Sequence, residues 1–140
     1  MPNKKKKVVH PVYERLGVIG IGKLLSFIPI AGNKNGLKKK KYFGKQVKLT
    51  SHRYKVYALN GTKCVNCKLT GTFFALEKSI SQRTDKFHFN LYAINKKKEE
   101  VMITIDHITP KAKGGSEALS NKQPMCFNCN NKKGDKIESK

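Results

Sequence analysis

Two Cys-x-x-Cys pairs constrain this chain more than any other feature of its sequence. Cys64 and Cys67 form the first pair, Cys126 and Cys129 form the second, and the sequence holds no other cysteines. Four thiolates complete the tetrahedral coordination that structural Zn²⁺ prefers, so we expect the chain to fold such that the two pairs meet. Four thiolates leave no open coordination position for a substrate. The spacing therefore predicts a structural zinc site.

A disulfide framework is the alternative interpretation of the same cysteines. Disulfides are typical of secreted proteins, whereas thiols stay reduced in a cytoplasm. We expect no export signal, and the most apolar stretch, residues 17–31, is too short and too often interrupted by glycine, lysine and proline to span a bilayer. We therefore expect bound zinc, a cytoplasmic location and no association with a membrane.

The charge of the chain indicates a polyanionic partner, and nucleic acid is the commonest one. Thirty lysines and arginines face nine acidic residues, which gives a formal net charge of +21. Residues 1–50 hold thirteen of the basic residues and a single acid, Glu14. Runs of lysine repel one another until a phosphate backbone neutralises them. We therefore interpret residues 1–44 as a basic, partly disordered arm and residues 45–140 as the folded domain.

Helix signals occur near the start and near the end of that domain. The first predicted helix is capped by Thr50 or Ser51 and stops at Gly61, because serine or threonine favours a helix start and glycine favours a helix end. The second begins near Cys126 and frays after Gly134.

A β-hairpin is predicted between these helices. Apolar and polar side chains alternate in residues 87–94 and again in residues 101–106, and a polar loop joins the two runs. The second strand delivers Asp106 and His107 to its end, where side chains can leave the sheet. A short element is expected over residues 119–125. These elements together predict an α+β fold.

Asp106 and His107 form the sharpest candidate for chemistry. A neutral imidazole can take a proton from water near pH 7, and a carboxylate is a hard ligand that suits Mg²⁺. An isolated Asp-His pair is more often a surface pair than a catalytic one. Asn130 changes that balance, because it directly follows Cys129 and its amide oxygen can be a second, neutral ligand at a position that the zinc site fixes.

The run from Asp106 to Gly134 resembles the HNH endonucleases, also called ββα-metal or His-Me finger nucleases. Their pattern is Asp-His-Ile-x-Pro, a loop rich in lysine and glycine, Asn-x-Gln, and then Cys-x-x-Cys-[His/Asn]-x-x-Lys. The corresponding segments here are residues 106–110, 111–115, 121–123 and 126–133. With the first cysteine pair the resemblance extends over the last eighty residues and is strongest to phage-encoded members.

The resemblance implies a zinc-stapled ββα-metal module that hydrolyses phosphodiester bonds of double-stranded DNA. His107 is then the general base, and Asp106 and Asn130 hold a catalytic Mg²⁺ or Mn²⁺. Asn121 is the middle asparagine, which orients the base. Because the last position is often histidine in the family, Asn130 makes the chain an HNN variant.

The loop and the last helix also carry the candidate DNA contacts. We expect Lys111, Lys113 and Lys133 to contact the DNA backbone, which contributes affinity without sequence information. A phage-encoded protein of this kind would act in the cytoplasm of a bacterial host cell.

Two other functions remain open at the level of the sequence. A non-catalytic zinc module that binds nucleic acid explains the charge and the cysteines, but it gives no reason for Asp106, His107 and Asn130 to occur together. An RNA nuclease is the second alternative.

Overall fold

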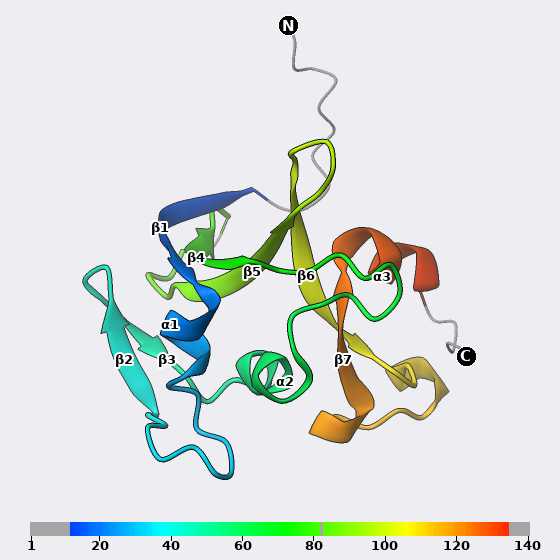
Figure 1. Ribbon diagram of the computed structural model, residues 1–140, viewed down its shortest axis with the longest axis horizontal. Helices are drawn as coiled ribbons and strands as arrows, with labels where there is room; N and C mark the ends of the chain where they lie inside the picture. The colour runs from blue at the N-terminus through cyan, green and yellow to red at the C-terminus, as the bar shows by residue number, and fades with distance from the viewer. Residues whose placement is uncertain (1–11, 82, 135–140) are drawn as a thin grey trace, which may run out of the picture.

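The computed structural model describes residues 12–81 and 83–134 and shows a mixed α/β architecture (Figure 1). A five-stranded antiparallel sheet has the order β1-β4-β5-β6-β7. Its strands are β1 (Tyr13–Gly20), β4 (Phe73–Ser79), β5 (His88–Ile94), β6 (Glu100–His107) and β7 (Lys122–Cys126). A separate two-stranded ribbon consists of β2 (Lys39–Tyr42) and β3 (Lys45–Lys48). The helices are α1 (Ile21–Leu25), α2 (His52–Asn60) and α3 (Phe127–Lys133), and short 3₁₀ turns span Lys111–Lys113 and Leu119–Asn121.

Helix α2 confirms the first predicted helix. The Ser51 side chain caps it by accepting a hydrogen bond from the Arg53 amide at 3.3 Å, and the helix ends at Gly61, whose φ of 91° suits a residue without Cβ. Two tyrosines fasten α2 to the sheet. The Tyr54 hydroxyl accepts from the backbone N–H of Phe89, and the Tyr57 hydroxyl donates to the carbonyl of Ile103.

The predicted hairpin is the pair β5–β6, which runs from Leu91 opposite Ile103 to Ile94 opposite Glu100. One face of this hairpin packs into the main core, which lies between the sheet and a layer formed by α1, α2 and the ribbon. A smaller cluster of Ala75, Tyr92 and Met102 covers the other face of the sheet. The end of β6, with its candidate catalytic residues, pairs with β7 and lies against α3.

Residues 12–44 differ from the predicted arm. β1 pairs with β4 from Tyr13 to Gly20, with an irregularity at Leu16, and Leu24 and Ile28 are fully buried in the main core. The apolar side chains of this segment bury enough surface to fold it against the sheet despite the surrounding charge. The boundary at residue 44 therefore does not separate an arm from the folded domain. Residues 1–11, which contain the first lysine run, lie outside the described residues.

None of the helices in residues 12–81 and 83–134 is long and apolar enough to cross a bilayer.

Candidate functional site

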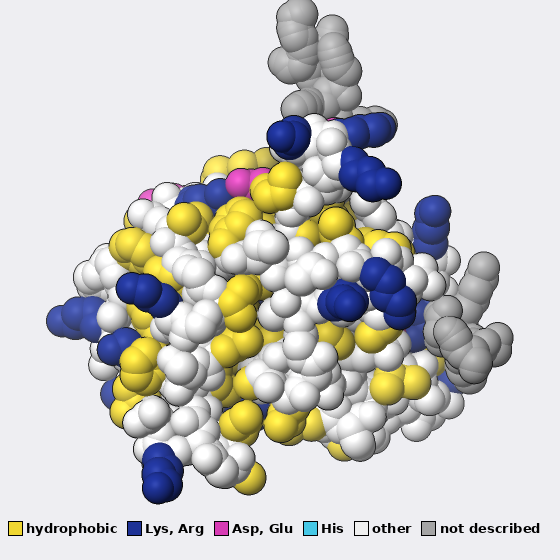
Figure 2. All heavy atoms as spheres, viewed as in Figure 1, with side chains coloured by type: hydrophobic (Ala, Val, Ile, Leu, Met, Phe, Trp, Pro, Cys, Tyr) yellow, Lys and Arg dark blue, Asp and Glu magenta, His cyan; other side chains and the backbone are white. Residues whose placement is uncertain are grey.

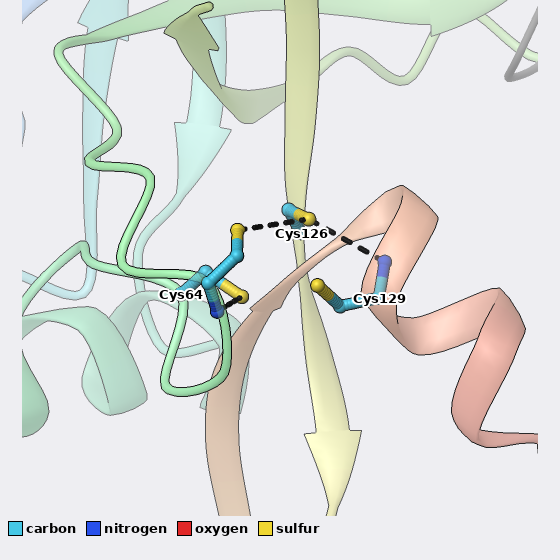
Figure 3. A group of neighbouring side chains, drawn as sticks. Cys64, Cys126 and Cys129 are labelled. Carbon is cyan, nitrogen blue, oxygen red and sulfur yellow. Dashed lines mark hydrogen bonds between the residues drawn. The ribbon is translucent and has the colours of Figure 1, made fainter.

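The fold brings the four cysteines together. Their sulfur atoms all lie within 4.8 Å of one another, and the Sγ atoms of Cys67 and Cys126 are 3.8 Å apart. Tetrahedral zinc with bonds of about 2.3 Å requires sulfur atoms that are roughly 3.8 Å from each other. Figure 3 shows Cys64, Cys126 and Cys129 pointing toward one another from a loop, the end of β7 and the start of α3. The cluster is therefore able to hold a metal ion such as zinc.

Backbone and side-chain donors surround the sulfur atoms. The amides of Cys67 and Cys129 donate to the sulfurs of Cys64 and Cys126, and the Asn66 amide donates to Cys129 at 3.2 Å. Burial alone would raise the pKa of Cys64, but hydrogen bonds from backbone N–H groups outweigh it and lower this pKa to about 7. Such donors favour the thiolate form that binds metal. Burial outweighs them at Cys67 and Cys126, where it raises the pKa of the thiol.

A cleft of about 250 Å³ lies beside the end of β6. Asp106, His107 and Asn130 all line it, together with Lys111 from the following loop. Asn130 lies on the first turns of α3, far from Asp106 and His107 in the sequence. The structure thus brings the predicted general base and the two predicted ligands into one cleft.

One oxygen of Asp106 is anchored by protein and the other is not. The residue is only 5% exposed, and its Oδ2 accepts hydrogen bonds from Lys133 Nζ at 2.7 Å and Gln123 Nε2 at 2.9 Å. Within the described part of the chain, no donor contacts Oδ1. The anchored oxygen fixes the carboxylate, so Oδ1 is left to bind a cation.

Lys133 was expected on the DNA backbone, and the structure corrects this. Its side chain is buried, and Nζ donates to Asp106 and to the carbonyls of His107 and Ile108 at 2.9 and 3.2 Å. A carboxylate that is almost fully buried is strongly destabilised without a nearby positive charge. Pairing with Asp106 therefore stabilises the protein by more than the Lys133 ammonium loses when it leaves water. Lys133 therefore ties α3 to the end of β6.

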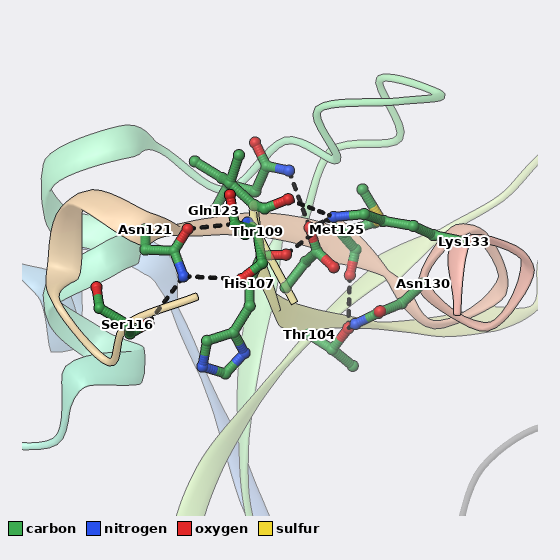
Figure 4. A network of polar contacts seen from close by, with 11 residues as sticks. Thr104, His107, Thr109, Ser116, Asn121, Gln123, Met125, Asn130 and Lys133 are labelled. Carbon is green, nitrogen blue, oxygen red and sulfur yellow. Dashed lines mark hydrogen bonds and ion pairs between the residues drawn. The ribbon is translucent and has the colours of Figure 1, made fainter. Parts of the chain in front are cut away.

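A short hydrogen-bond chain orients the Asn130 amide (Figure 4). The Thr104 hydroxyl donates to the Met125 carbonyl at 2.7 Å, so it has to accept from Asn130, whose Nδ2 lies 2.9 Å away. The amide nitrogen is therefore committed to Thr104. The amide oxygen has no donor among the described residues and is the atom left for a ligand in the cleft.

Asn121 holds the loop that follows the candidate base. Its Oδ1 accepts from the Thr109 amide at 2.9 Å, and its Nδ2 donates to the carbonyls of Thr109 and Ser116. Gly115 lies so close to Thr109 that a Cβ atom there would overlap the Thr109 carbonyl oxygen. Asn121 therefore fixes the backbone beyond His107, and its hydrogen bonds go to Thr109 and Ser116 rather than to the imidazole.

His107 faces an acid that sequence reasoning did not single out. Its Nε2 lies 3.3 Å from the carboxylate of Glu117, which also pairs with Lys111 at 2.8 Å and Lys122 at 3.3 Å. Hydrogen bonds from Lys111, His107 and Lys122 lower the pKa of Glu117 to about 2. Nothing in the local pattern of the sequence marks Glu117 or Lys122, because their proximity to His107 arises only when the loop folds back. Lys113 is exposed on the same loop.

The last third of the chain matches a known family. Residues 94–140 match the family model of the HNH endonucleases, which confirms the resemblance that residues 106–134 predicted. This match and the geometry of the cleft support a nuclease-type enzyme. No curated protein and no solved structure matches the chain.

Proposed function

We propose that this chain is a metal-dependent endonuclease that hydrolyses phosphodiester bonds of double-stranded DNA. His107 is the general base, Asp106 and Asn130 hold one Mg²⁺ or Mn²⁺, and the four cysteines hold a structural zinc. The observation that carries the proposal is the pair of free oxygens, Asp106 Oδ1 and Asn130 Oδ1, on residues that line one cleft with His107.

The donor set fits a hard cation. A carboxylate oxygen and an amide oxygen are ligands that Mg²⁺ accepts, and it commonly keeps waters and binds substrate phosphate at its other positions. When bound, such a cation neutralises the charge that develops on the phosphate and stabilises the leaving 3′-oxygen. Thiolates suit zinc instead, so the two candidate metal positions differ in ligand chemistry.

The protein groups divide the remaining work. His107 takes a proton from the water that attacks phosphorus. Lys133 and Gln123 hold Asp106 in place through its second oxygen, and Thr104 holds Asn130 through its amide nitrogen. These contacts fix the cation ligands before the substrate arrives, which avoids reorganisation during the reaction. The resemblance implies products with 5′-phosphate and 3′-hydroxyl ends.

A non-catalytic zinc module that binds nucleic acid is the second candidate. It accounts for the cysteine cluster and for the charge. It does not account for a buried carboxylate and an amide that both leave an oxygen without a donor in the same cleft.

The test uses purified full-length protein and end-labelled duplex DNA, with an RNA duplex of the same sequence as the comparison. We expect cleavage of the DNA with Mg²⁺ or Mn²⁺ and none with EDTA. Binding without cleavage under all divalent-ion conditions would support the non-catalytic module, and faster cleavage of the RNA would support an RNA nuclease.

A further inference from the structure

A long acid-free segment precedes the candidate catalytic site. Residues 16–76 contain twelve lysines and arginines and not one aspartate or glutamate. This segment includes the β2–β3 ribbon, which the HNH match does not cover. Charge of one sign over so much folded surface indicates a polyanionic partner rather than a need for solubility.

The two faces of the ribbon differ. The inner face is fixed to the protein: Val47 is buried in the main core, the Tyr42 ring packs edge-on against Phe89, and Lys40 Nζ lies 4.6 Å from the centre of the Phe27 ring. The backbone N–H of Leu49 also donates to the Lys38 carbonyl at 2.8 Å. The ribbon is therefore held firmly in one orientation.

The outer face consists of Lys39, Lys41, Gln46 and Lys48, all exposed. Lys39 lies directly opposite Lys48 in the register. Like charges in directly opposite positions destabilise a strand pair. Within residues 12–81 and 83–134, none of these three lysines forms an ion pair with an acid. The arrangement costs stability in the free protein, and a ligand that brings negative charge would remove that cost.

We propose that Lys39, Lys41 and Lys48, which we call the ribbon face, bind the phosphate backbone of duplex DNA outside the segment that is cut. The choice of DNA rests on the proposed function. Lysine ammonium groups are point charges that suit phosphate, and contacts with phosphate carry no sequence information. Binding through the ribbon face is therefore independent of sequence.

The ribbon face lies away from the cleft. Figure 1 places β2 and β3 at one end of the longest axis, and β7, α3 and the loop after β6 toward the other. Figure 2 shows dark blue side chains projecting at the end that holds the ribbon. A domain of this length has a radius of gyration of about 14 Å, so DNA that reaches both sites has to run along roughly 30–40 Å of protein. The ribbon face would thus hold DNA that flanks the cleaved bond.

The test measures binding of a labelled duplex over a range of salt concentrations, without divalent ions. Each phosphate contact contributes about 0.9 to the slope of log K against log salt, so the triple variant Lys39→Gln/Lys41→Gln/Lys48→Gln should lower this slope by up to about 2.7. The matched control is Lys96→Gln/Lys97→Gln/Lys98→Gln in the β5–β6 loop, which removes the same charge beside Glu99 and Glu100. The control should keep a slope close to that of the wild type.

Two further readouts separate phosphate binding from a structural role. The triple Lys→Arg variant of the ribbon face should restore the slope. The Gln variant should melt at or above the wild-type temperature, because it removes the Lys39–Lys48 repulsion. If the Gln variant melts lower, the single variants Lys41→Gln and Lys48→Gln carry the test, each with a slope lower by about 0.9.

A wild-type slope in the ribbon variant, or equal losses in the ribbon and control variants, would overturn the proposal. The proposal would also be overturned if the ribbon variant lost affinity for single-stranded DNA but not for the duplex. Failure of the nuclease proposal is distinguishable, because it would leave a wild-type protein that binds duplex through the ribbon face and never cleaves it.

Discussion

At the scale of single residues, the candidate site depends on the hydrogen bonds that each polar atom of Asp106 and Asn130 makes. One oxygen of Asp106 accepts hydrogen bonds from Lys133 and Gln123, and the amide nitrogen of Asn130 donates to Thr104. Each of these two cleft-lining residues therefore keeps one oxygen without a donor among the described residues. The sequence predicted that Asp106, His107 and Asn130 would lie together, and they line one cleft. The hydrogen bonds that orient them depend on partners that tertiary folding brings near.

Replacing Asn130 with alanine should raise the Mg²⁺ concentration needed for cleavage, because one of two protein ligands is lost. Asn130→His should retain activity with a different preference between Mg²⁺ and Mn²⁺, since an imidazole nitrogen is a softer ligand. The measurement is the cleavage rate as a function of metal concentration. Asn131→Ala, at the exposed next position, is the control. A wild-type metal dependence in Asn130→Ala would exclude this residue as a ligand.

Removing the buried charge of Lys133 should destabilise the protein. Lys133→Met preserves most of the volume but leaves the Asp106 carboxylate buried without its counter-charge, which typically costs about 3–5 kcal/mol. Denaturant unfolding measures the change, with the exposed neighbour in Lys132→Met as control. Equal stabilities of the two variants would mean that the Lys133–Asp106 pair does not hold α3 to β6.

The Glu117 carboxylate forms ion pairs with Lys111 and Lys122. A DNA phosphate would have to compete with Glu117 for these two ammonium groups. Glu117→Gln should therefore strengthen duplex binding by a few-fold in low salt, because these lysines no longer pair with a negative charge. Equilibrium binding measures the change. Glu99→Gln removes an acid from the β5–β6 loop and controls for net charge, and an equal gain in that variant would argue against competition at the cleft.

At the scale of elements, local signals predicted α2, the β5–β6 hairpin and α3. Each of these has its own cap, stop residue or alternation. The other sheet pairings, β1–β4, β4–β5 and β6–β7, were not predicted. Strand β4 is buried along most of its length and includes Glu77, whose charge is matched by Arg15 of β1. A strand that is buried along most of its length shows no alternation of apolar and polar residues. The arginine that neutralises the buried acid lies in a strand about sixty residues earlier.

The cysteine cluster joins the loop after α2 to the end of β7 and the first turn of α3. Because zinc binding and folding are coupled at such sites, Cys67→Ser should lower zinc content below one ion per chain and lower the melting temperature. Elemental analysis and thermal unfolding test this. A folded, active wild-type preparation without zinc would contradict the assignment.

At the scale of the whole molecule, we propose that the folded chain binds one DNA duplex through two surfaces. The cleft lies in the part that matches HNH endonucleases, and the ribbon face lies in the acid-free part before it. The sequence predicted the charge and its excess near the N-terminus. It did not predict that β1 joins the sheet, because its partner β4 lies about fifty residues further along the chain.

The ions at the two candidate metal positions should differ in how readily a chelator removes them. Brief treatment with EDTA should stop cleavage and leave the fold intact, because hard ligands in an open cleft exchange quickly whereas four thiolates hold zinc tightly. Added Mg²⁺ or Mn²⁺ should restore the rate. Loss of the circular dichroism spectrum together with activity would mean that EDTA removes the structural ion as readily as the catalytic one, which would contradict the expected difference.

The central claim is that His107 is the base of a DNA nuclease, and single-turnover cleavage by His107→Ala tests it most directly. The rate should fall by about 10²–10⁴-fold, the usual contribution of general-base catalysis. Affinity for the uncleaved duplex, measured in parallel without divalent ions, should stay within a few-fold of the wild type. Cleavage at the wild-type rate by the variant would contradict the account.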